Sequence, residues 1–158
     1  MNYLKSIMGL FSKLKSVVNS VTGGGAVVSL GYEEGSISSP FIVNVLVEVK
    51  DADIDAANVY LKYRAFEELL NKNMDEETGE VIEDWEVGEV YDKTFEAAGG
   101  QVLKAGEKYN FEVELDLADS NLVSFQGEER RVKCTLYAGI DCSGNDPDSG
   151  SKIINVSV

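Results

Sequence analysis

The stretch YNFEVELDL, Tyr109–Leu117, alternates apolar side chains with acidic or amide side chains without a break. Successive residues of a β-strand point to opposite faces, so a period of two residues predicts a strand with one buried face. The predicted core face of this strand carries Tyr109, Phe111, Val113, Leu115 and Leu117.

Other runs with the same period lie on both sides of this strand, and turn residues separate them. Short strands without intervening helices are typical of an antiparallel β-sandwich. We therefore expect an all-β, immunoglobulin-like sandwich of roughly seven or eight strands over residues 27–158. Its other predicted strands are Val27–Gly31, Phe41–Lys50, Val59–Phe66, Val90–Phe95, Val132–Asp141 and Lys152–Val158. Their expected inward residues near the C-terminus are Val132, Cys134, Leu136, Ala138, Ile140, Ile154, Val156 and Val158.

The middle of the chain is acidic and gives weaker signals. Phe66–Leu70 spaces its apolar residues as one helical turn does, and we expect a helical turn there. Asn71–Asp92 holds nine acidic residues and one basic residue, Lys72. A run of like charges is typical of a solvated surface rather than of a shielded catalytic pair. Within it, Trp85 and Val87 indicate the edge of a strand.

The N-terminal stretch MNYLKSIMGLFSKLKSVVNSVT has three lysines and no acid, in contrast to the rest of the chain. At about 100° per residue its apolar side chains fall on one half of a helical wheel. This pattern predicts an amphipathic helix over residues 1–22, followed by a glycine hinge over residues 23–26. The helix face must cover its own domain, a partner or a membrane surface. The contact residues expected for a partner or membrane are Leu4, Ile7, Met8, Phe11, Leu14 and Val18, with Lys5, Lys13 and Lys15.

Composition restricts the possible functions. The formal net charge is −14, so nucleic-acid phosphates would be repelled and nucleic acid is not an expected partner. The chain has no histidine, which removes the commonest general base and zinc ligand. No motif for catalysis or for a cofactor occurs, and we expect neither a catalytic residue nor a cofactor. The sequence thus predicts a protein that is not an enzyme.

The two cysteines, Cys134 and Cys142, lie on one predicted strand. Eight strand residues span about 26 Å, whereas a disulfide needs Cα atoms within about 7 Å. Two free thiols are therefore expected, as in a cytoplasmic protein. The basic helix adds the expectation of a peripheral position at the inner membrane surface.

Two acidic clusters are candidate calcium sites. Asp51, Asp53 and Asp55 begin like a calcium loop, but alanine and lysine stand where such a loop needs glycine and glutamate. The cluster in DCSGNDPDSG offers carboxylate and amide oxygens, yet hairpin loops use the same residue types. No metal is expected, and the candidate ligands in the second cluster are Asp141, Asn145, Asp146 and Asp148.

Three segments together resemble one lobe of an arrestin-fold protein. They are LKAGEKYNFEVELDL, the later strand RRVKCTLYAGID and the earlier strand NVYLKYRAFEEL. Their order is similar to the N-terminal half of bacterial sporulation-control proteins, which also begin with a short basic and apolar segment and glycines. The resemblance implies a single arrestin-like lobe preceded by the amphipathic helix.

The resemblance implies a non-enzymatic adaptor or regulatory scaffold that binds protein partners. Reversible membrane docking through the helix would fit that role, since three lysines contribute only about 1 kcal/mol each near an anionic surface. The alternative is a structural subunit of a self-assembling filament, tube or virion particle, whose helix packs between neighbouring copies.

Overall fold

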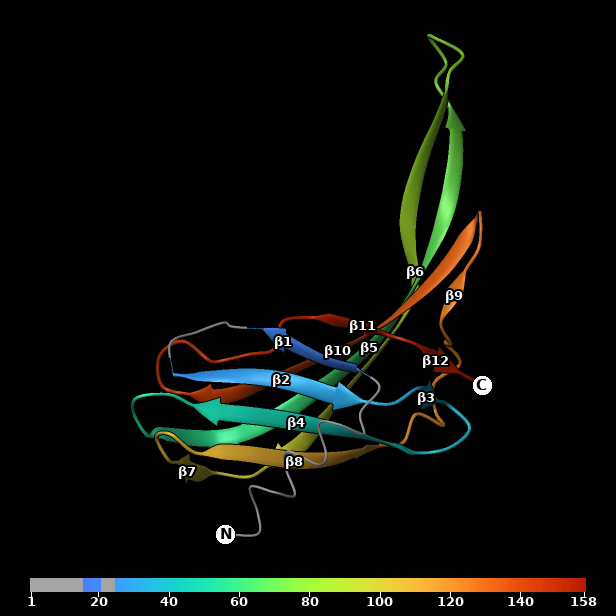
Figure 1. Ribbon diagram of the computed structural model, residues 1–158. Coiled ribbons are helices and arrows are strands. Elements are labelled where there is room, and N and C mark those ends of the chain that lie inside the picture. Colours follow the sequence, from blue (N-terminus) through green and yellow to red (C-terminus); the bar gives the residue numbers. More distant parts are fainter. Residues whose placement is uncertain (1–15, 21–24) are drawn as a thin grey trace.

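The computed structural model describes residues 16–20 and 25–158, and these residues form β-strands joined by turns. Two sheets lie face to face and enclose one apolar core (Figure 1). Over this part of the chain, no helix is long and apolar enough to cross a bilayer. The expected all-β sandwich is confirmed for these residues.

Each sheet consists mainly of antiparallel pairs. The N-terminal sheet has the order β1 (Ser16–Ser20), β2 (Ala26–Tyr32), β4 (Phe41–Val49) and β8 (Lys108–Leu115). The second sheet, here called the arm sheet, has the order β11 (Lys152–Ile154), β10 (Arg130–Cys142), β5 (Ile54–Met74) and β6 (Val81–Ala98). Short strands complete the fold: β7 (Gln101–Leu103) on β5, β9 (Phe125–Gln126) on β10, and the parallel pair β3 (Gly35–Ser36) and β12 (Val156–Ser157).

The core lies where the alternating faces of the two sheets meet. On β5, Leu61, Tyr63 and Ala65 are buried, and they stand in register with Ala138, Leu136 and Cys134 of β10. On β4, the valines at 43, 45, 47 and 49 belong to the same buried cluster. The strand face predicted for β10 is therefore confirmed.

Three expected details of the strands were wrong. Phe66–Leu70 is not a helical turn, because it continues β5 and pairs with both β10 and β6. Val158 is 79% exposed, since the final pair ends one residue earlier. Tyr109 and Phe111 are only partly buried against the core, because they lie on β8, the edge strand of its sheet.

The N-terminal expectation needs a correction as well. Ser16–Ser20 is a strand paired with β2, so the predicted helix does not reach residue 22. Serine, valine and asparagine are poor helix formers, and β2 offers them an open strand edge. Ala26, assigned to the hinge, is a fully buried residue of β2. Residues 1–15 and 21–24 lie outside the described part of the chain.

Replacing Leu61 by alanine should lower the free energy of unfolding by about 2–5 kcal/mol, because this fully buried leucine fills the centre of the core. Leu69→Ala on the same strand is the matched control, since Leu69 is 40% exposed. Its expected loss is below about 1 kcal/mol. Urea unfolding curves measure both, and equal losses would contradict the assigned core.

The native protein should show one slowly reacting thiol and the unfolded protein two. Both cysteines are free, Cys134 being buried and Cys142 half-buried. Burial and the carboxylates of Asp146 and Asp141 raise the pKa of the Cys142 thiol, so little thiolate forms at neutral pH. Its reaction with a disulfide reagent should therefore speed up as the pH rises. A disulfide found in the unreduced protein would contradict the fold.

Candidate functional site

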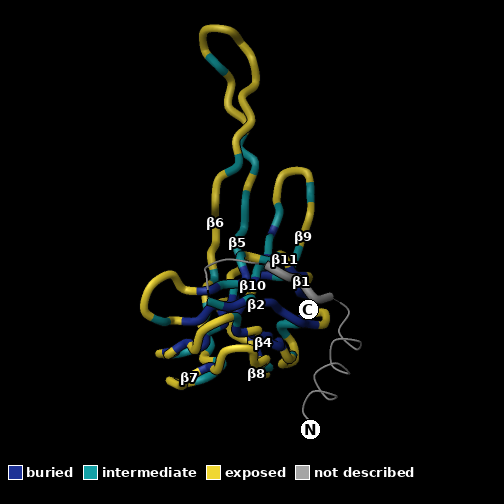
Figure 2. The backbone as a smooth tube through the Cα atoms, turned by 60° about the vertical axis from the view of Figure 1, so that its left-hand side comes forward, coloured by how far each residue is buried: buried dark blue, intermediate teal, exposed yellow. Residues whose placement is uncertain are grey.

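The hairpin of β5 and β6 projects far beyond the sandwich as a two-stranded arm (Figures 1 and 2). We define the arm as residues 66–90, from the cross-strand pair Phe66 and Val90 to the turn at its tip. β10 pairs with β5 only as far as Leu69. Leu70 still donates its backbone N–H to the Glu129 carbonyl at 2.8 Å, and past Leu70 the two arm strands pair only with each other in the described chain.

A β-bulge marks the base of the arm. Between the pairs Phe66–Val90 and Glu68–Val87, β6 has one residue more than β5. Gly88 lies in the bulge, where a Cβ atom would come within 2.9 Å of the Glu67 carboxylate. A bulge increases the local right-handed twist of a strand pair, and twist at this point turns the arm relative to the body.

One face of the arm carries a stripe of apolar side chains. Cross-strand neighbours share a face, so the register puts Leu70 beside Trp85 and Met74 beside Val81. This is the outward face of the arm sheet, opposite to the core side occupied by Ala65. Met74 is 69% exposed, and Val81 and Val87 are each 59% exposed. The ion pair of Lys72 and Glu83, at 3.8 Å, crosses the same face between these two pairs. The full stripe consists of Phe66, Leu70, Met74, Val81, Trp85, Val87 and Val90.

Charged groups hold the start of β10 against the base of this stripe. The Arg131 guanidinium lies 4.0 Å from the centre of the Trp85 ring and donates a hydrogen bond to the Glu68 carboxylate. Lys133 lies 3.2 Å from the same carboxylate. Arg131 first, and then Lys133, holds the pKa of Glu68 below its usual range. The base of the arm is thus bound to the body by charge-assisted contacts.

The far half of the arm is acidic and ends in a hydrogen-bonded turn. The Asp75 carboxylate accepts hydrogen bonds from the backbone N–H groups of Glu77 and Thr78, each at 2.8 Å. These bonds lower the pKa of Asp75. Gly79 supplies the positive φ, 72°, that closes the turn. The whole arm holds ten acidic residues and the single basic residue Lys72.

The structure does not bring the predicted contact residues of the N-terminus into a site. Val18 lies in β1 rather than on a helix. The other eight lie outside the described residues: Leu4, Lys5, Ile7, Met8, Phe11, Lys13, Leu14 and Lys15.

The candidate calcium ligands serve as loop contacts. Asp146 accepts a hydrogen bond from the backbone of Cys142, and Asp148 accepts one from the backbone of Gly150. Asn58 donates to Asp141 at 3.5 Å. In the first acidic cluster, Asp53 accepts from the Ala105 backbone at 2.9 Å and from Lys104 at 3.0 Å. Within the described ranges, no group of three or more carboxylates or thiols is placed to hold a metal ion.

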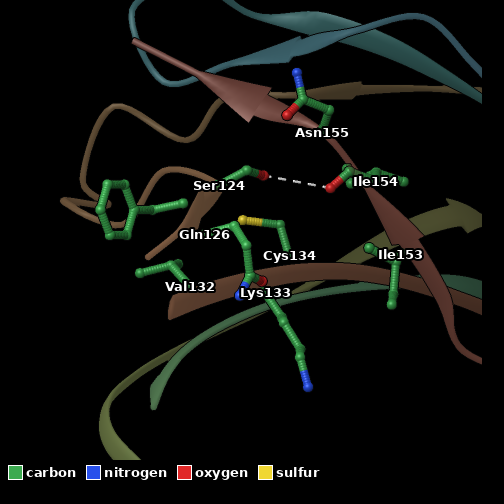
Figure 3. A pocket seen from close by; sticks show the side chains of 9 residues that line it. Ser124, Gln126, Val132, Lys133, Cys134, Ile153, Ile154 and Asn155 are labelled. Atoms are coloured by element: carbon green, nitrogen blue, oxygen red, sulfur yellow. Dashed lines mark hydrogen bonds between the residues drawn. The ribbon is translucent and has the colours of Figure 1, made fainter. Parts of the chain in front are cut away.

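A shallow hollow of about 420 Å³ opens where β9 and β11 leave part of the edge of β10 uncovered (Figure 3). The Ser124 side chain lies across the hollow, and its hydroxyl donates a hydrogen bond to the backbone carbonyl of Ile154 at 3.4 Å. Cys134 lies beneath it, fully buried, and Lys133 and Asn155 complete its polar lining. The lining offers hydrogen bonds and apolar contacts.

The sequence analysis did not predict the apolar stripe. It indicated only a solvated acidic run with a strand edge at Trp85 and Val87. On β6, Trp85 and Val87 alternate with acids, as in DWEV, whereas Glu83 takes the outward position between Val81 and Trp85. That period of two was the available signal. What the sequence could not supply was the register that joins these residues to Leu70 and Met74 on β5.

No protein-family model matches the chain, and no curated protein matches it. Among solved structures, the fold is similar to Spo0M, a sporulation control protein from Bacillus subtilis, with a TM-score of 0.54 and 18% sequence identity. The match covers 86% of this chain but 51% of that one, so the chain spans about half the length of the structure it matches. The arrestin-like fold expected from the sequence is thereby shown.

Proposed function

We propose that this protein is a non-enzymatic, arrestin-like adaptor or regulatory scaffold that binds a protein partner through its arm. The observation that carries the proposal is the exposed apolar stripe on a strand pair that contributes nothing to the core. Monomeric proteins rarely leave large apolar side chains clustered on an exposed face unless that face is used for binding. The fold-level likeness to a sporulation control protein supports a regulatory role by analogy only.

The charge of the arm specifies the partner further. With ten acidic residues against Lys72 alone, the arm attracts a basic surface and repels anionic lipid. The outer edge of β6 has no strand partner in the described chain, and it can accept an added strand. An extended basic segment with apolar residues at every second position matches both features.

A second copy of the arm is a poor partner by the same reasoning. Antiparallel pairing of two β6 edges would place the acid-rich stretch Glu83–Glu89 of one copy opposite the same stretch of the other. Like charges directly across a strand pair are destabilising. This disfavours the alternative of a self-assembling structural subunit, at least one assembled through its arms.

A photo-crosslinking amino acid at Val87 should trap a discrete partner in cells of the source organism. The pair of changes Met74→Glu and Val81→Glu should abolish the crosslink, because two charges then interrupt the stripe. The matched control is Asn71→Glu with Asn73→Glu, which adds the same charge on the opposite face of the arm. That variant should keep the crosslink.

The same crosslinker at Val102 gives the control for position, because Val102 is 48% exposed on β7, outside the arm. A trapped band should depend on the arm position and weaken as salt screens the charges. Identical bands from both positions, or loss of the band in both double variants, would contradict an arm-specific partner.

Membrane contact through residues 1–15 is a separate part of the proposal. The full chain should pellet with anionic vesicles at low salt and be released at high salt, as expected for three lysines. Phe11→Glu with Leu14→Glu should abolish pelleting, whereas the arm variant Met74→Glu with Val81→Glu should not affect it. Pelleting that is unchanged by the first variant, or equal with neutral vesicles, would reject membrane contact through this segment.

A further inference from the structure

Two residues of β4 are buried on the side of the N-terminal sheet that faces away from the core. Asn44 is 3% exposed and Leu46 is 4% exposed. They alternate with the core-facing valines of the same strand, so they point to the opposite, outer face. Leu46 accordingly does not belong to the core cluster, although it is buried. The outer face of an antiparallel sandwich is ordinarily solvated.

Neighbouring strands extend this buried area across the sheet. The register places Ser29 and Asn110 on either side of Leu46, and Gly31 and Glu112 on either side of Asn44. Ser29 is 7% exposed, although it too faces outward. The four strands run side by side in Figure 1, and the small residues on β2 leave Leu46 as the largest apolar group at the centre of this face.

The same face holds two buried hydrogen-bond acceptors without donors. Among the described residues, the side-chain oxygens of Asn44 and Asn110 are buried and have no hydrogen-bond partner. Buried polar groups nearly always have a partner in folded proteins. The outer face therefore lacks donors that an occupant would supply.

We propose that residues 1–15 of the same chain pack against the outer face of the N-terminal sheet, which we call the seat of this segment. These residues directly precede Ser16, the first residue of β1, and β1 is the edge strand of this sheet. A helix of 15 residues is about 22 Å long. Four strands span about 14 Å, and the nine residues of β4 about 30 Å. The segment is thus long enough to cover the face without leaving the sheet to which it is joined.

The chemistry of the two surfaces is complementary. The segment offers an apolar side that includes Ile7 and Phe11, which suits Leu46 and the neighbouring Ile42. Its lysines match the exposed carboxylates of Glu112 and Glu114, which lie on the same outer face. The third carboxylate of this face, Glu48, already pairs with Lys108 at 3.4 Å. Lysine and serine side chains also bring the donors that Asn44 and Asn110 lack.

The arm is the less suitable seat for this segment, despite its acidity. Its apolar stripe lies on the outward face of the arm sheet, on the far side of the sandwich from the outer face around Leu46. A segment joined at Ser16 would have to pass around the body to reach it. Seating on the N-terminal sheet also hides the apolar side that membrane contact requires, so the two states of the segment exclude each other.

Limited trypsin digestion of the full chain tests this seat, with mass spectrometry counting the cuts after Lys5, Lys13 and Lys15. Cleavage needs the unseated state, so Leu46→Lys should speed these cuts about tenfold. Ile7→Ser with Phe11→Ser should do the same from the other side of the contact. The matched control is Leu69→Lys, the same change on the arm, which should leave the rate unchanged.

Wild-type protein that is cut as fast as both variants would overturn the proposal, because the segment would then never be seated. Protection that neither Leu46→Lys nor the double variant removes would also overturn it, since the segment would lie elsewhere. Protection that falls on dilution would assign the seat to a second copy, against the same-chain arrangement. Each readout is independent of the arm and of its partner.

Discussion

The pairing of β5 with two neighbours is the constraint on which the rest of the structure depends. Along the body, β5 lies between β10 and β6, and its inward residues Leu61, Tyr63 and Ala65 are covered by the other sheet. Past Leu70, β10 has ended, and the inward positions become polar at Asn71 and Asn73. The apolar positions change to the outward face over the preceding residues, Phe66–Leu70. One continuous strand therefore contributes its inward face to the core along the body and presents apolar residues on its outward face along the arm.

This change of face explains which parts of the fold could be predicted from the sequence. The runs that became β4, β8 and β10 keep one period and one buried face, so their alternation was sufficient to place them. At Phe66–Leu70 the apolar residues move from one face of β5 to the other, and the resulting spacing imitates a helical turn. Two flanking strands impose the extended conformation there, and local spacing contains no information about them.

The candidate sites depend on contacts that a sequence pattern does not encode. Trp85 and Val81 were visible as apolar residues, but only the register of β5 and β6 unites them with Leu70 and Met74 in one stripe. Leu46 alternates with the core-facing valines of its strand, and its burial is evident only in three dimensions. The expected helix included the residues of β1 because valines at helical spacing also suit a strand. Pairing with the edge of β2 favours the strand.

The position of Trp85 has a consequence for spectroscopy. It is the only tryptophan of the chain, and it lies at the base of the arm under the Arg131 guanidinium rather than in the core. Intrinsic fluorescence therefore reports the opening of the arm base, while far-ultraviolet circular dichroism reports the strands of the whole sandwich. Thermal curves from the two signals will separate whenever the arm frays first, without any intermediate in the folding of the body.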